Sequence, residues 1–179
     1  KESKDLNQKT MTIEVEINNG FKSEAYQILT NPTIQAISRI IDGKLSWSKD
    51  LVVFIDLMKA SLKSNENGIA LAANQIWSDP KAPCPRVFVM WDEDHTKIEE
   101  YINPTVKGTG KTLKLEEACL SFVGFVTRKS RAKNATVTYQ TLDSPELLHT
   151  VKYSGLLSQA VQHEVDHLDG KPIKKINNG

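Results

Sequence analysis

Residues 162–170 read QHEVDHLDG and contain the pattern H-E-x-x-H, around which the rest of the chain is organised. On an α-helix, residues four apart lie on one face, so His163 and His167 can direct their imidazoles at a single metal ion. Glu164 follows the first histidine and can take a proton from a water molecule on that ion. Two surface histidines with no metal are the plain alternative, but the pattern favours a metal site on a helix.

No residue downstream of this stretch can complete such a site. After Asp169 the sequence contains no Asp, Glu, His or Cys, whereas zinc proteases with this pattern take their third ligand from that side. Asp169 lies two residues past His167, on the wrong side of the helix to join both histidines. The third ligand must come from upstream, where the candidates are Cys84, Cys119, His95 and His149.

The surroundings of these four residues do not decide among them. Cys84 lies between two prolines and His95 in an acidic turn, so we expect both to be surface loop residues. His149 lies in an expected strand, where a cross-strand surface contact is the simpler role. Cys119 ends an apolar strand, and a cysteine there is usually a small buried hydrophobe.

Length and composition indicate one ordinary globular domain. The chain has 179 residues, of which 39% are hydrophobic and 25% charged, enough to bury a core without disulfides. A net charge of +1 gives no electrostatic case for a nucleic-acid or membrane partner, and we expect the basic cluster at 128–133 to be a solvated edge. Two cysteines fit a reducing compartment.

Hydrophobic periodicity predicts two helices and several strands. One helix is expected to begin near Ser48, because apolar residues recur there at helical spacing: Leu51, Ile55, Met58 and Leu62. A second helix is expected to carry the two histidines, with Ser154 before its first turn and Gly170 after its last. A short helix is expected from Asn31-Pro32 through Ile41. Strands are expected at 12–17, 86–91, 97–102, 113–117, 136–142 and 147–153. This order predicts an α+β domain with antiparallel sheets packed around a central metal-binding helix.

Three separated segments together resemble the peptide deformylases, which remove the formyl group from the initiator methionine of new polypeptides. The family pattern G-φ-G-L-A-A-x-Q is matched by GIALAANQ at 68–75, E-G-C-L-S by EACLS at 117–121, and Q-H-E-x-D-H-L-x-G by residues 162–170. Ile102-Asn103-Pro104 also resembles the family's I-N-P. The segments fall in family order, and the similarity runs from about Tyr26 to Ile173.

The chain departs from the family pattern at several places. Ala70 and Ala118 stand where the family has glycine, and a methyl group there is felt if the backbone must approach a substrate or adopt positive φ. Only residues 171–179 follow the helix, which is similar to the shortened viral forms. We expect residues 1–25 to be a partly disordered extension, 26–173 a single catalytic domain and 174–179 a short tail.

The resemblance implies that Cys119, His163 and His167 bind one divalent metal and leave a position open, the arrangement of a catalytic site. It implies Fe(II) as the ion, with Zn, Ni or Co as substitutes. Glu164 would take the proton of the attacking water and return it to the leaving amine. The Gln75 amide and the Leu120 backbone N–H would stabilise the developing oxyanion, although Gln75 without its motif reads as an ordinary loop residue.

The resemblance also implies a substrate groove. The peptide would pair with the backbone of Gly68, Ile69 and Ala70 as an added strand. Its methionine side chain would enter an apolar pocket whose walls are Ile69, Leu115, Leu156, Gln159 and Ala160. Gln159 is polar where the family is usually apolar, and Leu115 and Leu156 could equally be core residues. Asp166 and Gln162 are candidates for orienting the metal ligands, or simply exposed polar residues of a helix.

Two other classes of function stay open from the sequence. One is a metallopeptidase or other amidase that uses the same Cys/His/His site; the other is a catalytically silent module that binds formyl peptides. The absence of a downstream ligand disfavours the proteases, and Glu164 disfavours a silent binder. The resemblance implies N-formylmethionyl nascent peptides near the ribosome as partners, with no nucleic acid or membrane partner, and a monomer. We expect the protein to be located in the cytoplasm, in the host cytoplasm if the protein is viral, or in an organelle if a transit segment was removed.

Overall fold

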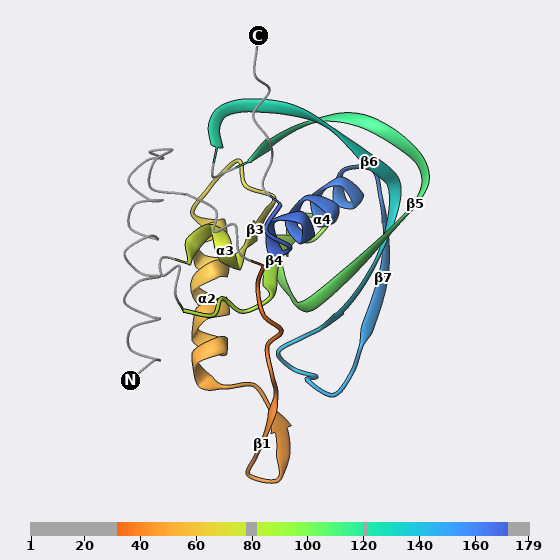
Figure 1. The fold of residues 1–179 in the computed structure, drawn as a ribbon. Coiled ribbons are helices and arrows are strands. Elements are labelled where there is room, and N and C mark those ends of the chain that lie inside the picture. The colour runs from red at the N-terminus through yellow and green to blue at the C-terminus, as the bar shows by residue number, and fades with distance from the viewer. Residues whose placement is uncertain (1–31, 78–81, 120–121, 172–179) are drawn as a thin grey trace.

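The structure, a computed structural model, describes residues 32–77, 82–119 and 122–171, with the main chain alone described at 118–119 and 122–127 (Figure 1). The predicted strand at 12–17, the extension 1–25 and the tail 174–179 lie outside these residues. In chain order the elements are β1 (Arg39–Ile41), β2 (Lys44–Ser46), α2 (Lys49–Lys63), β3 (Ala70–Ala72), α3 (Ala73–Ile76), β4 (Val87–Trp91), β5 (Ile98–Cys119), β6 (Phe122–Gln140), β7 (His149–Ser154) and α4 (Gly155–Leu168).

The strands form two antiparallel sheets. β1 and β2 make a separate hairpin, while β3 to β7 make a five-stranded sheet in which each strand pairs with its neighbour in the sequence. The long β5–β6 pair curves around α4 (Figure 1), which contacts all five strands of this sheet. The predicted α+β class with antiparallel sheets around the histidine-bearing helix is confirmed.

β5 joins two of the predicted strands into one. The runs at 97–102 and 113–117 are parts of a single 22-residue strand, and the polar residues between them continue it. The pairing with β6 shifts register between Ile102 and Thr105 and again between Thr109 and Thr112. Such irregularities bend a strand and increase its twist, which is how β5 curves around α4. A polar run with no clear alternation gave no sequence signal for this continuity.

Helix α2 begins where the sequence predicts. The Ser48 hydroxyl accepts a hydrogen bond from Leu51 N at 3.2 Å, which satisfies one N–H of the first turn. The predicted stripe of Leu51, Ile55, Met58 and Leu62 is buried. α2 contacts β3, β4 and β5, and its apolar face therefore fixes the part of the sheet from which α3 departs.

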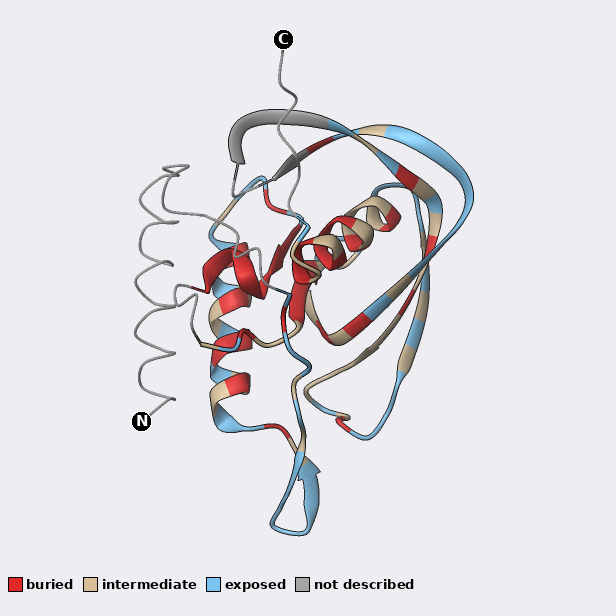
Figure 2. Cartoon of the chain, in the orientation of Figure 1, coloured by how far each residue is buried: buried red, intermediate tan, exposed pale blue. Residues whose placement is uncertain are grey.

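Helix α4 carries the histidines into the centre of the molecule. Ser154 precedes it in an extended conformation but makes no side-chain capping bond, and Gly170 follows it at φ +76°. Positive φ is the conformation glycine adopts most easily after a helix C-terminus. Figure 2 shows buried residues concentrated in α3, β3 and β4 and along the inner side of α4. The two histidines are thus held in the interior by packing on several strands.

The short helix predicted through Ile41 is wrong. Residues 33–36 are not helical, because their backbone groups bond to other parts of the chain: Thr33 N to Leu168 O, Ile34 N to Cys84 O, and Ala36 N to the side chain of Asn103. Residues Arg39–Ile41 then form β1. Tertiary hydrogen bonds outweigh the weak local preference of an N-cap followed by proline.

The core is continuous between the helices and the sheet. In β4, four consecutive residues from Val87 to Met90 are buried, so both of its faces are covered. Both α2 and α4 contact this strand. None of the helices in the described part of the chain is long and apolar enough to cross a lipid bilayer.

Candidate metal centre

His163, Glu164 and His167 bring their donor atoms to one place on α4. Their candidate ligand atoms all lie within 4.8 Å of one another, and the two ring Nε2 atoms are 2.7 Å apart. All three residues are buried, with His167 completely inaccessible. The i, i+4 spacing therefore places two imidazoles against each other, as predicted from the sequence.

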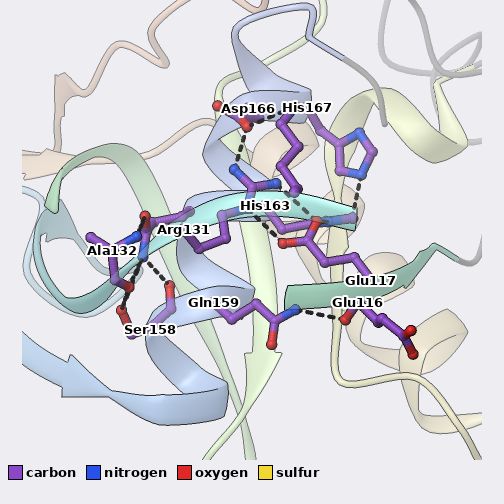
Figure 3. A network of polar contacts seen from close by, with 11 residues as sticks. Glu116, Glu117, Arg131, Ala132, Ser158, Gln159, His163, Asp166 and His167 are labelled. Carbon is purple, nitrogen blue, oxygen red and sulfur yellow. Dashed lines mark hydrogen bonds and ion pairs between the residues drawn. The ribbon is translucent and has the colours of Figure 1, made fainter. Parts of the chain in front are cut away.

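Glu117 of β5 contacts the His163 ring on its Nδ1 side, away from His167. Its Nδ1 lies 2.8 Å from Glu117 Oε2, and Arg131 of β6 donates to both oxygens of the same carboxylate, at 2.6 Å to Oε1 and 3.0 Å to Oε2. Arg131 also donates from Nη1 to Asp166 Oδ2 at 2.5 Å. Figure 3 shows this network running from His163 through Glu117 and Arg131 back to α4.

The charge state of Glu117 determines which nitrogen of the His163 ring carries a proton. Burial alone would raise the pKa of Glu117, but hydrogen bonds from His163 and Arg131 outweigh it and bring the pKa to about 2. An ionised carboxylate only accepts hydrogen bonds, so His163 Nδ1 must be the donor. In the neutral ring, Nε2 then carries the lone pair that a metal requires.

Burial also sets the charges of the other two residues. It lowers the pKa of His167 well below its usual value, which keeps the ring neutral and able to bind a cation. It raises the pKa of Glu164 to about 7. Glu164 Oε2 is buried and, within the described residues, has no hydrogen-bond partner. Two converging imidazoles beside such a carboxylate fit a divalent cation and its water ligand.

Helix α3 places Gln75 and Asn74 next to α4. Ala72 N donates to Gln75 Oε1 at 2.8 Å, which orients the amide so that its donating end, Nε2, faces away from Ala72. Asn74 Nδ2 donates to the backbone carbonyl of His167. Both residues are buried. The structure therefore fixes α3, with its predicted oxyanion donor, directly to the helix that carries both histidines.

The third predicted ligand is described only by its backbone. Cys119 lies two residues after Glu117 and is the last residue of β5, where it pairs with Phe122 of β6. Its side chain, and the predicted oxyanion donor Leu120, lie outside what the structure describes. The placement of Cys119 Sγ against the two histidines stays a prediction.

The other three upstream candidates lie elsewhere in ordinary roles. His95 is exposed and stacks on Trp91, with ring centroids 3.9 Å apart, and His149 stacks on Tyr139 across the β6–β7 pair, as expected. Cys84 is not the surface residue we expected; it is buried in the core. Its loop is packed because Ile34 N and Arg86 N form hydrogen bonds across it.

The predicted substrate groove is partly visible. Ala70 lies in β3, which is the edge strand of the five-stranded sheet, and Gly68 is buried just before it. Ile69 and Leu156 are exposed, at 36% and 60%, so the alternative that Leu156 is core is wrong. Leu115 and Ala160 are half-buried, and Gln159 donates from Nε2 to Glu116 O at 3.0 Å (Figure 3).

Sequence reasoning missed Glu117 and Arg131 as partners of the metal-binding helix. The expectation that the cluster at 128–133 is solvated is wrong for Arg131, which is 5% exposed. One signal was present: Arg131 shares its strand face with Ala135 and Val137, both buried. Of the two residues proposed to orient ligands, Asp166 acts through Arg131, whereas Gln162 forms hydrogen bonds to both backbone groups of Ala132.

Comparisons with known proteins agree with this geometry. A sequence profile described as polypeptide deformylase matches residues 29–178. The peptide deformylase of Thermodesulfovibrio yellowstonii is 35% identical over 124 residues, 68% of this chain and 70% of the relative. That of Orientia tsutsugamushi is 33% identical over 153 residues, 78% of each chain.

Solved structures give the same result. The peptide deformylase of Synechococcus elongatus, in complex with actinonin, superposes with a TM-score of 0.66 at 25% identity, over 84% of this chain and 77% of that one. The enzyme of the Vibrio parahaemolyticus bacteriophage VP16T, also with actinonin, gives 0.61 at 26% identity, over 81% of this chain and 93% of that one.

Proposed function

The chain belongs to the polypeptide deformylase family, and we propose that the cluster on α4, together with Cys119, is the site where it removes the N-formyl group from nascent peptides. The observation that carries this assignment is the convergence of two imidazole Nε2 atoms, 2.7 Å apart, beside the buried carboxylate of Glu164. The family is metal-dependent, and this donor set suits a divalent cation. The ion we propose is Fe(II), with Zn, Ni or Co as substitutes.

Cys119, His163 and His167 would hold the ion. Once bound, the cation supplies an acidified water and polarises the formyl oxygen. Glu117 keeps His163 in the tautomer whose Nε2 can act as a ligand, because the ionised carboxylate accepts the proton of Nδ1. Burial keeps His167 uncharged. His163 is thus prepared for binding by Glu117, and His167 by its burial.

Glu164 is the proton carrier in this proposal. Its burial raises its pKa to about 7, so the carboxylate can accept a proton from the attacking water and release it to the leaving amine near neutral pH. The products are formate and the free N-terminal amine. Gln75 would donate from Nε2 to the oxygen that gains negative charge, with its Oε1 already occupied by Ala72 N. Leu120 N–H is proposed as the second donor.

The substrate backbone would add to the open edge of β3. Edge strands offer unpaired N–H and C=O groups for an extended peptide, and Gly68, Ile69 and Ala70 lie at this edge. Ile69, Leu115, Leu156, Gln159 and Ala160 would surround the methionine side chain. The exposed Leu156 and Ile69 support an apolar contact with substrate, since a folded core would have covered them.

The cellular setting follows from the substrate. We propose a monomer that meets N-formylmethionyl peptides near the ribosome, in the cytoplasm, the cytoplasm of a host cell or an organelle. The catalytic domain would span residues 26–173, flanked by an N-terminal extension and a short tail.

One assay tests the proposal. Anaerobically purified, iron-loaded protein is incubated with a formyl-Met tripeptide and with the same peptide lacking the formyl group. We expect formate release from the first and an intact peptide bond in both. Peptide-bond cleavage would indicate a metallopeptidase, and binding without turnover would indicate a silent formyl-peptide module.

A further inference from the structure

Arg131 joins the sheet to the histidine-bearing helix through three hydrogen bonds. Its Nε and Nη2 donate to the two oxygens of Glu117 on β5, and its Nη1 donates to Asp166 on α4. Only 5% of the arginine side chain is exposed. Lys129 Nζ lies 3.6 Å from the same Asp166 oxygen, at the outer end of the network. The guanidinium is therefore the central group between the two elements (Figure 3).

The contacts form a closed loop that returns to its starting helix. His163 contacts Glu117, Glu117 contacts Arg131, Arg131 contacts Asp166, and Asp166 lies three residues after His163 on α4. Residues three apart are neighbours on a helix surface. A loop of this kind fixes both the position of the helix along the sheet and the rotation of the His163 ring.

The Glu117 carboxylate cannot hold the ring in place unless it is itself held. A carboxylate bound by one imidazole can rotate about its last side-chain bond, but a planar guanidinium that donates to both oxygens fixes its plane. Lysine could not do this, because an ammonium is a point charge without a rigid fork. The geometry at Glu117 thus depends on an arginine at position 131.

We propose that Arg131 is a positioning residue for the metal centre: it acts through Glu117 to fix the His163 ring, so that Nε2 is presented to the cation. The inference rests on the proposed function only for the role of His163 as a ligand. Arg131 itself touches neither the ion nor the substrate.

A purely structural role is the competing explanation, and the chain offers a matched control for it. Arg86 binds the residue that ends the same helix: it donates from Nη1 to Asp169 at 2.7 Å and from Nε and Nη2 to Pro104 O. Like Arg131 it is a largely covered arginine with three hydrogen bonds, but within the described part of the chain these bonds go to Asp169 and Pro104 and not to the groups that hold His163. Loss of Arg86 should weaken the fold without changing the ring of His163.

The experiment compares the full-length wild type with Arg131→Met, Arg131→Lys and Arg86→Met. The affinity for Co(II) is measured by competition with a chelator, the stability of the metal-free protein by urea unfolding, and the tautomer of His163 by 15N NMR. For Arg131→Met we expect affinity about 10–100-fold weaker and a mixed tautomer. Arg131→Lys should recover part of the affinity, whereas Arg86→Met should lose stability only.

Equal affinity losses in Arg131→Met and Arg86→Met, or an unchanged His163 tautomer in Arg131→Met, would overturn the proposal. If Arg131→Met does not fold, Asp166→Asn removes only the second anchor of the guanidinium, and it should weaken Co(II) binding by a smaller factor than Arg131→Lys. Unchanged binding in Asp166→Asn would count against the proposal. None of these three measurements uses substrate. Failure of the wild type to release formate would therefore overturn the proposed function alone.

Discussion

Asn74 Nδ2 lies 2.5 Å from the backbone carbonyl oxygen of His167, although the two residues are 93 positions apart in the sequence. The carbonyl also accepts a hydrogen bond from Gly170 N at the end of α4. Through this contact, α3 with Gln75 and α4 with His163, Glu164 and His167 are joined at one point. The proposed oxyanion donor and the proposed metal ligands are thus linked through the Asn74 amide.

We expect Asn74→Ala to loosen this connection. Removal of one partner of a buried hydrogen bond costs about 1–3 kcal/mol, so urea unfolding should show a loss of that order. Because Gln75 follows on the same short helix, kcat should fall more than KM rises. Asn67→Ala, a substitution at an exposed position, serves as the control. Wild-type kcat in Asn74→Ala would mean that Gln75 is positioned without it.

Glu164→Gln tests the proton carrier. The amide keeps the shape of the side chain but cannot accept a proton, so kcat should fall by about 10²–10⁴-fold, with the bound metal retained. A metal assay by atomic absorption and formate release measure the two quantities. If turnover persists at the wild-type rate, Glu164 does not have this role.

The two cysteines should respond differently to substitution. Cys119→Ala removes a proposed ligand, and we expect the loss of metal affinity to exceed the roughly 10–100-fold typical of outer groups. Cys84→Ala should keep the metal, because Cys84 is part of the core. Burial raises the pKa of the Cys84 thiol, so it should also react slowly with thiol reagents in the folded protein. Metal loss in Cys84→Ala but not in Cys119→Ala would reverse the assignment.

Gly108 allows β5, β6 and α4 to approach closely. A Cβ at this position would lie 2.7 Å from Ala132 Cβ and 3.5 Å from Gln162 Oε1. Gly108→Ala should therefore cost about 1–3 kcal/mol of unfolding free energy. The double variant Gly108→Ala with Ala132→Gly removes the clash and should recover part of that loss, as a thermal unfolding series can show. Additive losses in the double variant would place the cost elsewhere.

The tyrosines of the sheet should make the fold sensitive to alkali. Burial, and then the charges of Tyr153 and Glu99, raise the pKa of Tyr139 from 10.0 to about 12, and burial also raises that of Tyr101. A folded-state pKa above the unfolded value stabilises the protein below pH 10, and this stability is lost as the pH rises from 10 to 12.

Urea midpoints measured across this range should decline as phenolate absorbance grows. Tyr101→Phe should lower stability at neutral pH, because Tyr153 loses its hydroxyl partner at 2.5 Å, but it should make the decline shallower. A decline as steep as in the wild type would assign the effect to other groups.

The sequence predicted the parts of the molecule that depend on local spacing. The i, i+4 pair of histidines, the apolar stripe of α2 and the start of that helix near Ser48 follow from local pattern, and the structure contains all three. The α+β class followed from the order of these elements. The resemblance of three short motifs then indicated the family.

Long-range hydrogen bonds account for what the sequence could not predict. The segment from Thr33 to Ala36 is not helical, because its bonding partners lie at residues 84, 103 and 168. Arg131 looked like a solvated charge because its partners, Glu117 and Asp166, belong to two other elements. Cys84 was assigned to the surface from its prolines, although its loop packs into the core.

The order of elements along the chain has a consequence for protein synthesis. Helix α4 follows every strand of the sheet, so a ribosome produces Glu117 and Arg131 well before His163 and His167. A chain released before α4 is translated would therefore lack both imidazoles of the cluster on this helix.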